Sequence, residues 1–119
     1  MDLLNIEVVD SAQNAEIVVF RLKGHLDAQT VRELEGSFTL QLQAARVRWI
    51  VDLGGLDYIS SAGLGSFIGV LAELQAKGGN IFFIGMTPKI EKIFKMLGFM
   101  RIFKIFASEA EAVRAFKGA

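Results

Sequence analysis

The sequence contains no cysteine, one proline (Pro88) and one histidine (His25) among its 119 residues. Without cysteine there is no disulfide scaffold, no thiolate nucleophile and no cysteine-based zinc site. A single imidazole makes a histidine-rich metal centre unfavourable and leaves a Ser-His-Asp triad only His25 as its base. We therefore expect no bound metal, no cofactor and no catalytic residue.

An excess of charge of one sign and a long apolar run are missing as well. Lys and Arg number 13, as do Asp and Glu, so the formal net charge is zero and a general electrostatic grip on nucleic acid is disfavoured. No apolar run approaches the ~20 residues of a membrane span. The N-terminal segment MDLLNIEVVD lacks the basic region of a signal peptide. The sequence thus predicts a cytoplasmic protein with no membrane span and no direct contact with nucleic acid.

Hydrophobic residues are abundant, at 52% of the chain, which indicates one dense domain over residues 1–119. Strand patterns occur at residues 3–10, 16–23, 46–53, 80–85 and 102–106. Helical patterns occupy residues 28–44 and an apolar stripe that runs from Leu64 out to about residue 77. A third helix is expected with Thr87 as its N-cap, Pro88 as its first residue and Gly98 at its end, and a short fourth one after Ser108. These patterns predict an α/β fold of order β-β-α-β-α-β-α-β-α, with four helices on a mixed, mostly parallel sheet. The first strand should be antiparallel to the second, and Gly54-Gly55 should end the third.

The start of the second expected helix is unusual because two serines are followed by three glycines, at positions 63, 65 and 69. Each glycine in a helix interior costs up to ~1 kcal/mol relative to alanine. One interpretation is close packing of the helix on the sheet, with Ser61 as a simple cap. The other is an open surface that a partner approaches, with Ser61 accessible. Asp27 is expected to cap the preceding helix.

The segment from Val51 to Gly65 reads VDLGGLDYISSAGLG and resembles the motif of the STAS domain. It is most similar to the bacterial anti-sigma factor antagonists of the SpoIIAA and RsbV type. There a strand ends in D-L-S and is followed by F-I-D-S-S-G-L-G. Gly24-His25-Leu26-Asp27 matches the G-E-L-D of that family, and the similarity covers nearly the whole chain.

The resemblance implies a switch rather than an enzyme. The phosphorylated serine of the family aligns with Ser61, and Ser60, which replaces an aspartate of the motif, is the alternative acceptor. The unmodified protein would bind an anti-sigma factor that is also an ATP-dependent serine kinase and so release the sigma factor. Phosphorylation would end this binding, and a serine phosphatase would remove the phosphate and reset the switch. The implied partner-binding residues are Asp27, Ser60, Ser61, Ala62, Gly63, Gly65 and Gly69.

Several alternatives remain open at this stage. A STAS module can also be a scaffold subunit of the stressosome type or an accessory subunit of a lipid-transport complex. The basic residues around the third helix form either a lipid or nucleic-acid patch or simply a solvated face. Phe99 and Met100 are candidates for an exposed contact, and the chain is expected to be a monomer or a weak homodimer. His25 is interpreted as a solvated or partner-facing side chain.

Overall fold

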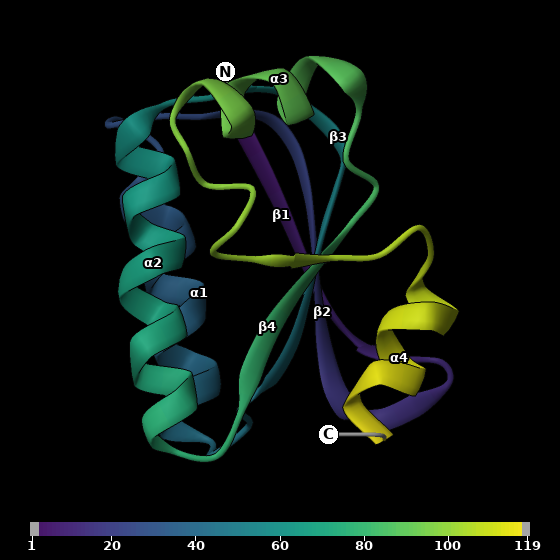
Figure 1. Cartoon of the computed structure of the whole chain (residues 1–119). Helices are drawn as coiled ribbons and strands as arrows, with labels where there is room; N and C mark the ends of the chain where they lie inside the picture. The colour runs from purple at the N-terminus through teal and green to yellow at the C-terminus, as the bar shows by residue number, and fades with distance from the viewer. Residues whose placement is uncertain (1–2, 118–119) are drawn as a thin grey trace.

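A computed structural model describes residues 3–117 and has the expected order of elements (Figure 1). The strands are β1 (Leu4–Ser11), β2 (Asn14–Leu26), β3 (Arg48–Ile59), β4 (Asn80–Ile84) and β5 (Lys104–Ile105). The helices are α1 (Val31–Gln43), α2 (Ser61–Ala76), α3 (Pro88–Met96) and α4 (Glu109–Lys117). Within the described residues, no helix combines the length and apolarity needed to cross a bilayer.

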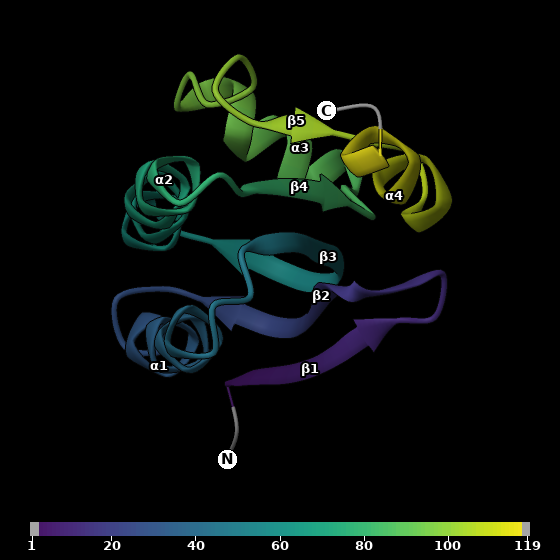
Figure 2. The same cartoon turned by 90° about the horizontal axis from the view of Figure 1, so that it is seen from below.

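The five strands form one sheet in the order β1-β2-β3-β4-β5. β1 is antiparallel to β2, whereas β2, β3, β4 and β5 are parallel, so both expectations about strand direction are confirmed. Helices α1 and α2 lie side by side on one face of the sheet and α4 covers the other (Figure 2). Helix α3 lies across the end of the sheet at which β3 leads into α2 (Figure 1).

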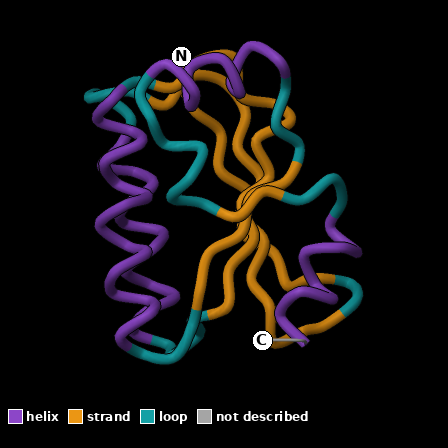
Figure 3. The backbone as a smooth tube through the Cα atoms, in the orientation of Figure 1, coloured by secondary structure: helices purple, strands orange, loops and turns teal. Residues whose placement is uncertain are grey.

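Alternation along the strands produces a hydrophobic core on each face of the sheet. Phe20, Trp49 and Phe83 point toward α1 and α2 and belong to the larger core. Val19 and Phe82 point the other way, into a smaller core beneath α4. A tube through the backbone shows how the strands cross between these two helical layers (Figure 3). Because both faces are covered, β4 can be almost wholly apolar, as its sequence NIFFI indicates.

The third strand does not end at Gly54-Gly55, contrary to expectation, but continues to Ile59. The pairing of β2 and β3 shifts register here, between Arg21 and Lys23 and again between Gly24 and His25. A Cβ atom at position 55 would lie 2.6 Å from Cγ of Lys23 and 3.0 Å from the Leu22 carbonyl oxygen. Glycine therefore permits a close approach of two strands at an irregular pairing rather than ending one of them.

The last strand is shorter than the expected 102–106. The Ile102 N–H donates to the Phe99 carbonyl at 3.1 Å, which holds that part of the segment in a turn. Phe103 is then buried in the larger core, and only Lys104 and Ile105 pair with β4. Strand propensity in the segment IFKIF is overridden by this turn and by the burial of its aromatic side chains.

The predicted helix ends are mostly confirmed. Thr87 caps α3 by accepting from the Ile90 N–H at 3.3 Å, with Pro88 as the first helical residue. Gly98, with φ of 77°, follows the end of α3. The expectation that Phe99 and Met100 are exposed is wrong, because both are partly buried against the larger core.

Candidate functional site

The two segments singled out in the sequence meet at one end of the sheet. β2 ends at Leu26 and β3 at Ile59, and because the strands are parallel their carboxyl ends lie next to each other. The Ser60 N–H donates to the Leu26 carbonyl at 2.9 Å. This bond holds the loop that begins at Asp27 beside the first turn of α2.

The residue that caps α2 is Ser60, not Ser61. Ser60 has an extended backbone, and its Oγ accepts a hydrogen bond from the Gly63 N–H at 3.3 Å. Ser61 is the first residue of the helix and is exposed. Its hydroxyl makes no hydrogen bond within residues 3–117. The interpretation of Ser61 as a structural cap is therefore wrong, and its hydroxyl is open to solvent.

The three glycines of α2 divide into two kinds. A Cβ on Gly63 would lie 2.8 Å from Cγ of Leu26 and 3.0 Å from Cγ1 of Ile59, so this glycine allows close packing on the strand ends. A Cβ on Gly65 or Gly69 would meet no atom within 4 Å. Close packing therefore explains Gly63, whereas no contact among the described residues requires a glycine at position 65 or 69. That a partner approaches α2 at these two open positions stays a prediction.

Asp27 organises the turn before α1 rather than capping the helix directly. Its Oδ1 accepts from the Gln29 and Thr30 N–H groups at 2.9 and 3.1 Å. Thr30 Oγ1 in return accepts from the Asp27 N–H at 3.0 Å, the reciprocal arrangement of a capping box. The helix begins at Val31, with Thr30 as its N-cap and no side-chain cap bond. The Asp27 side chain is thus occupied by its own loop, and it lies next to the strand end that contacts α2.

A shallow groove of about 500 Å³ runs between α1 and α2 next to Ser61. Phe38, Leu42 and Val70 give it apolar walls, and Ala62, Gly65 and Gly69 line its α2 side. Two carboxylates, Glu35 and Glu73, are the charged residues among its lining. Glu35 and Thr39, the exposed α1 residues of this groove, were not predicted from the sequence. Exposed positions of an amphipathic helix cannot be assigned to a site until the neighbouring helix is known.

The N-terminal turn of α2 is the positively polarised part of this site, and it lies next to the acidic groove. The first turn of α2 holds no acidic residue, and the amide groups at a helix N-terminus carry partial positive charge. No group of three or more potential metal ligands occurs among the described residues. His25 is exposed and lies edge-on to Tyr58, with the ring centroids 6.3 Å apart. This position fits the interpretation of His25 as a side chain that faces solvent.

A second polar cluster lies on the opposite face of the sheet, at the start of α4. Arg21 donates to Asp52 Oδ2 and to Glu109 Oε1, both at 3.0 Å, and the Ser11 hydroxyl donates to Glu109 Oε2 at 2.8 Å. The hydrogen bond to Glu109 is the largest influence on Arg21 and raises its pKa above the ordinary value. Asp52 is thus part of an ion-pair cluster that attaches α4 to the sheet.

Comparison with known proteins identifies relatives of the whole domain. The model of the STAS domain family matches residues 8–112. BtrV of Bordetella bronchiseptica, which carries the name of an anti-sigma factor antagonist, is 34% identical over 98 residues, covering 82% of this chain and 84% of its own. The anti-sigma-B factor antagonist of Staphylococcus epidermidis is 32% identical over 95 residues, covering 80% and 85%.

Among solved structures, the anti-sigma factor antagonist SpoIIAA in its unphosphorylated form superimposes with a TM-score of 0.73 at 25% identity. That alignment covers 97% of this chain and 100% of SpoIIAA. The phosphorylated form of SpoIIAA from Bacillus gives a TM-score of 0.69 at 26% identity, covering 94% and 99% of the two chains. The similarity extends over both faces of the sheet, because it includes nearly every described residue.

Proposed function

The chain belongs to the STAS domain family, and we propose that it is an anti-sigma factor antagonist, a regulator that catalyses no reaction itself. In its unmodified form it binds an anti-sigma factor, which is also an ATP-dependent serine kinase, and thereby releases the sigma factor. Phosphorylation of Ser61 ends this binding, and a serine phosphatase restores it. The switch operates in the cytoplasm, where a sigma factor meets RNA polymerase.

The observation that supports this proposal is the difference between the two adjacent serines, Ser60 and Ser61. Ser60 caps α2, whereas Ser61 is exposed and its hydroxyl makes no hydrogen bond to the part of the chain that the structure describes. A phosphate at the N-terminal turn of a helix is stabilised by about 0.3–1 kcal/mol at a surface. The fold therefore tolerates the modified serine, and the effect of phosphorylation falls on the complex rather than on the free protein.

The surface beside Ser61 explains how a phosphate would act on a complex. Gly65 and Gly69 present bare backbone, so a partner can approach α2 closely. Phosphorylation adds about 1.5 to 2 negative charges in the middle of that contact. Glu35 and Glu73 already make the adjacent groove acidic. Like-charge repulsion and desolvation together need to supply only about 4 kcal/mol to weaken binding about a thousandfold.

The test measures binding to the anti-sigma factor kinase of the same organism by titration calorimetry. The wild type and Ser61→Ala should bind with similar affinity, whereas the enzymatically phosphorylated protein should lose about a thousandfold. Ser61→Asp adds one charge only and should lose at least about tenfold. Ser108→Ala is the matched control, because Ser108 caps α4 on the other face of the sheet by accepting from the Glu111 N–H. It should lower the free energy of unfolding by about 1 kcal/mol without a change in kinase binding.

Peptide mass spectrometry of the protein after incubation with kinase and ATP identifies the acceptor. A phosphate on Ser61 is expected, and a phosphate on Ser60 would retain the switch but transfer it to the alternative serine. Equal binding by the wild type, Ser61→Asp and the phosphorylated protein would contradict the proposal. Assembly into large particles would then favour a stressosome-type scaffold, and co-purification with an ATPase would favour a lipid-transport subunit.

A further inference from the structure

The outer surface of α3 and the turn after it combine exposed apolar side chains with unpaired positive charge. Met96 is 74% exposed, Leu97 45% and Ile102 47%. Lys89, Lys92 and Arg101 are exposed around them and form no ion pair within the described residues. We call these six residues the α3 patch. An exposed cluster of large apolar residues bordered by polar ones is typical of an interaction surface.

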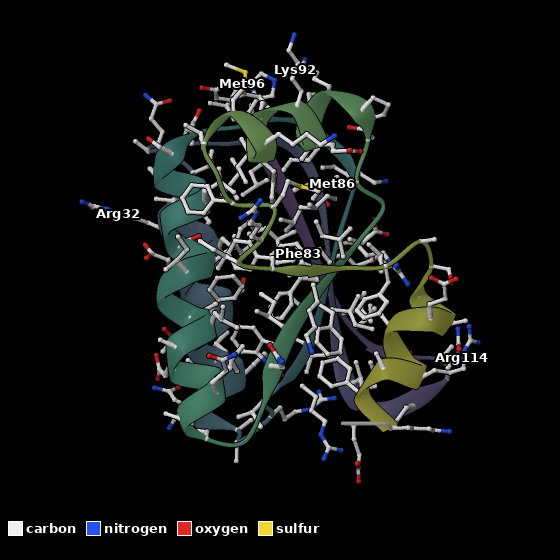
Figure 4. The ribbon with its side chains drawn as sticks, in the orientation of Figure 1. Arg32, Phe83, Met86, Lys92, Met96 and Arg114 are labelled. Carbon is white, nitrogen blue, oxygen red and sulfur yellow. The ribbon has the colours of Figure 1, made fainter. Side chains whose placement is uncertain are left out.

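The spacing along α3 places the two kinds of side chain on one stripe. Lys89, Lys92 and Met96 are three and four residues apart, so they share the face opposite the buried Ile90 and Phe94. Lys92 and Met96 project from the same end of the molecule, away from the sheet (Figure 4). Lys95 lies beside this stripe and is partly neutralised by Glu91, with Nζ and Oε1 2.8 Å apart.

The charge of this region differs from that of the rest of the chain. Residues 86–106 contain five basic residues and one acidic residue, and the remaining residues have four more acidic than basic ones. Lys104 belongs to that count but faces the smaller core, where its Nζ lies 5.9 Å from the Phe82 ring centroid. The neutral net charge thus conceals a positive segment, and that segment also contains the exposed Met96.

We propose that the α3 patch docks on the surface of a bilayer that contains anionic lipids, with Met96, Leu97 and Ile102 entering the interface and the cations meeting the headgroups. The apolar face of α3 is buried in the core, so the contact rests on these three exposed side chains and on the Lys and Arg residues around them, the two features that attract a protein to an anionic interface. Two of the three unpaired cations are lysines, whose flexible stems suit a diffuse layer of charge better than a defined carboxylate. Helix α3 is the outermost element at its end of the molecule, so a flat surface can reach it (Figure 1).

Docking in this way would hold the end of the molecule that contains Ser61 near the bilayer, because α2 begins at that same end (Figure 1). The inference stands independently of the proposed switch, since it uses none of the residues assigned to it. It adds a second interaction surface, one that takes lipid headgroups rather than a protein.

The test is co-sedimentation of the full chain with vesicles of phosphatidylcholine alone or mixed with phosphatidylglycerol. Each of the three unpaired cations should contribute about fivefold to partitioning, so the anionic vesicles should bind about a hundredfold more strongly. High salt should abolish most of this difference. Equal binding to both kinds of vesicle, or none to either, would overturn the proposal.

Variants locate the contact on the molecule. Lys92→Gln should reduce partitioning about fivefold, and Met96→Ser should reduce it by up to about tenfold. Lys77→Gln and Leu40→Ser are the matched controls, because these residues are also exposed but lie outside the α3 patch. Equal losses in the control variants would overturn the assignment. Binding to soluble polyglutamate but not to anionic vesicles would also overturn it, in favour of an acidic macromolecule.

Discussion

The first turns of α2 and α4 are capped by the same chemistry but have different surroundings. Ser108 caps α4 by accepting from the Glu111 N–H at 3.2 Å, as Ser60 does for α2 from Gly63. At α4 the next residue, Glu109, has a side chain only 18% exposed that is bonded to Arg21 and Ser11. At α2 the next residue, Ser61, is exposed and unbonded among the described residues. The side chain that follows the cap is bonded within the protein at α4, whereas at α2 it is exposed to solvent.

This contrast separates stability from recognition. A polar group that already has partners inside the protein cannot bind another molecule without breaking them, which costs roughly 1–3 kcal/mol. The bonded groups at the start of α4 therefore stabilise the sheet, whereas the exposed groups at the start of α2 can bind a partner. Substitutions on the two sides should differ in what they change: unfolding on the α4 side, and partner affinity on the α2 side.

The largest effect on stability is expected at Arg21. Arg21→Met leaves Glu109 and Asp52 without their shared cation, and both carboxylates are partly buried. The loss should lie between that of an exposed and that of a buried ion pair, at about 2 kcal/mol in the free energy of unfolding. Urea titration followed by the fluorescence of the single tryptophan, Trp49, measures it.

The control for Arg21 is Arg48→Met, which removes an exposed pair with Glu16 at 3.4 Å and should cost less than about 0.5 kcal/mol. Because the pKa of Arg21 is raised in the folded protein, its contribution is complete below the unfolded pKa and disappears only at strongly alkaline pH. The difference between Arg21→Met and the wild type should therefore be constant at neutral and moderately alkaline pH. A difference that vanishes there would contradict the assigned role of the cation.

The next effect distinguishes the glycines within α2. Gly63→Ala places a Cβ against Leu26 and Ile59, and the strain should exceed the gain in helix propensity. We expect a net decrease of about 1–2 kcal/mol in the free energy of unfolding. The same urea titration measures it. An unchanged or increased stability would show that the two side chains can move aside at no cost.

A smaller effect is expected at Asp27, which both stabilises its own loop and is a candidate contact for the partner. Asp27→Ala removes an acceptor for two backbone N–H groups and should cost about 1 kcal/mol of stability. Asp27→Asn retains the Oδ1 acceptor but removes the charge. If Asp27 also contacts the kinase, the asparagine variant should bind it more weakly at unchanged stability, as calorimetry would measure. Full binding by Asp27→Asn would limit the residue to its role in the loop.

The sequence predicts most of this architecture because the periodic patterns are strong. The order of elements, the antiparallel first pair and the capping of α3 by Thr87 are all confirmed. The predictions fail where tertiary contacts decide a local choice. Gly54-Gly55 is a strong strand-breaking signal, yet β3 continues through it, because Gly55 allows the close approach of Lys23 in the neighbouring strand β2.

The candidate site was predictable in position but not in detail. The position of Ser61 at a helix start follows from the apolar stripe that begins at Leu64. Which of two adjacent serines caps the helix depends on where the extended strand ends, and β3 ends one residue before Ser60. Glu35 and Glu73 line one groove only because α1 packs against α2. The local sequence pattern of either helix does not predict that packing.

The smallest change in stability, and the one of opposite sign, is expected at Gly65 and Gly69. An alanine there meets nothing within 4 Å, so Gly65→Ala and Gly69→Ala should each raise the free energy of unfolding by about 0.5–1 kcal/mol. The same methyl group should hold a partner away from α2 and weaken kinase binding about tenfold. Gly36→Ala is the matched control, because it is also an open helical glycine, on α1, and lies outside the lining of the groove. It should stabilise the protein equally and bind the kinase as the wild type does. A gain in stability without any loss of binding at positions 65 and 69 would remove these glycines from the docking surface while leaving Ser61 as the switch.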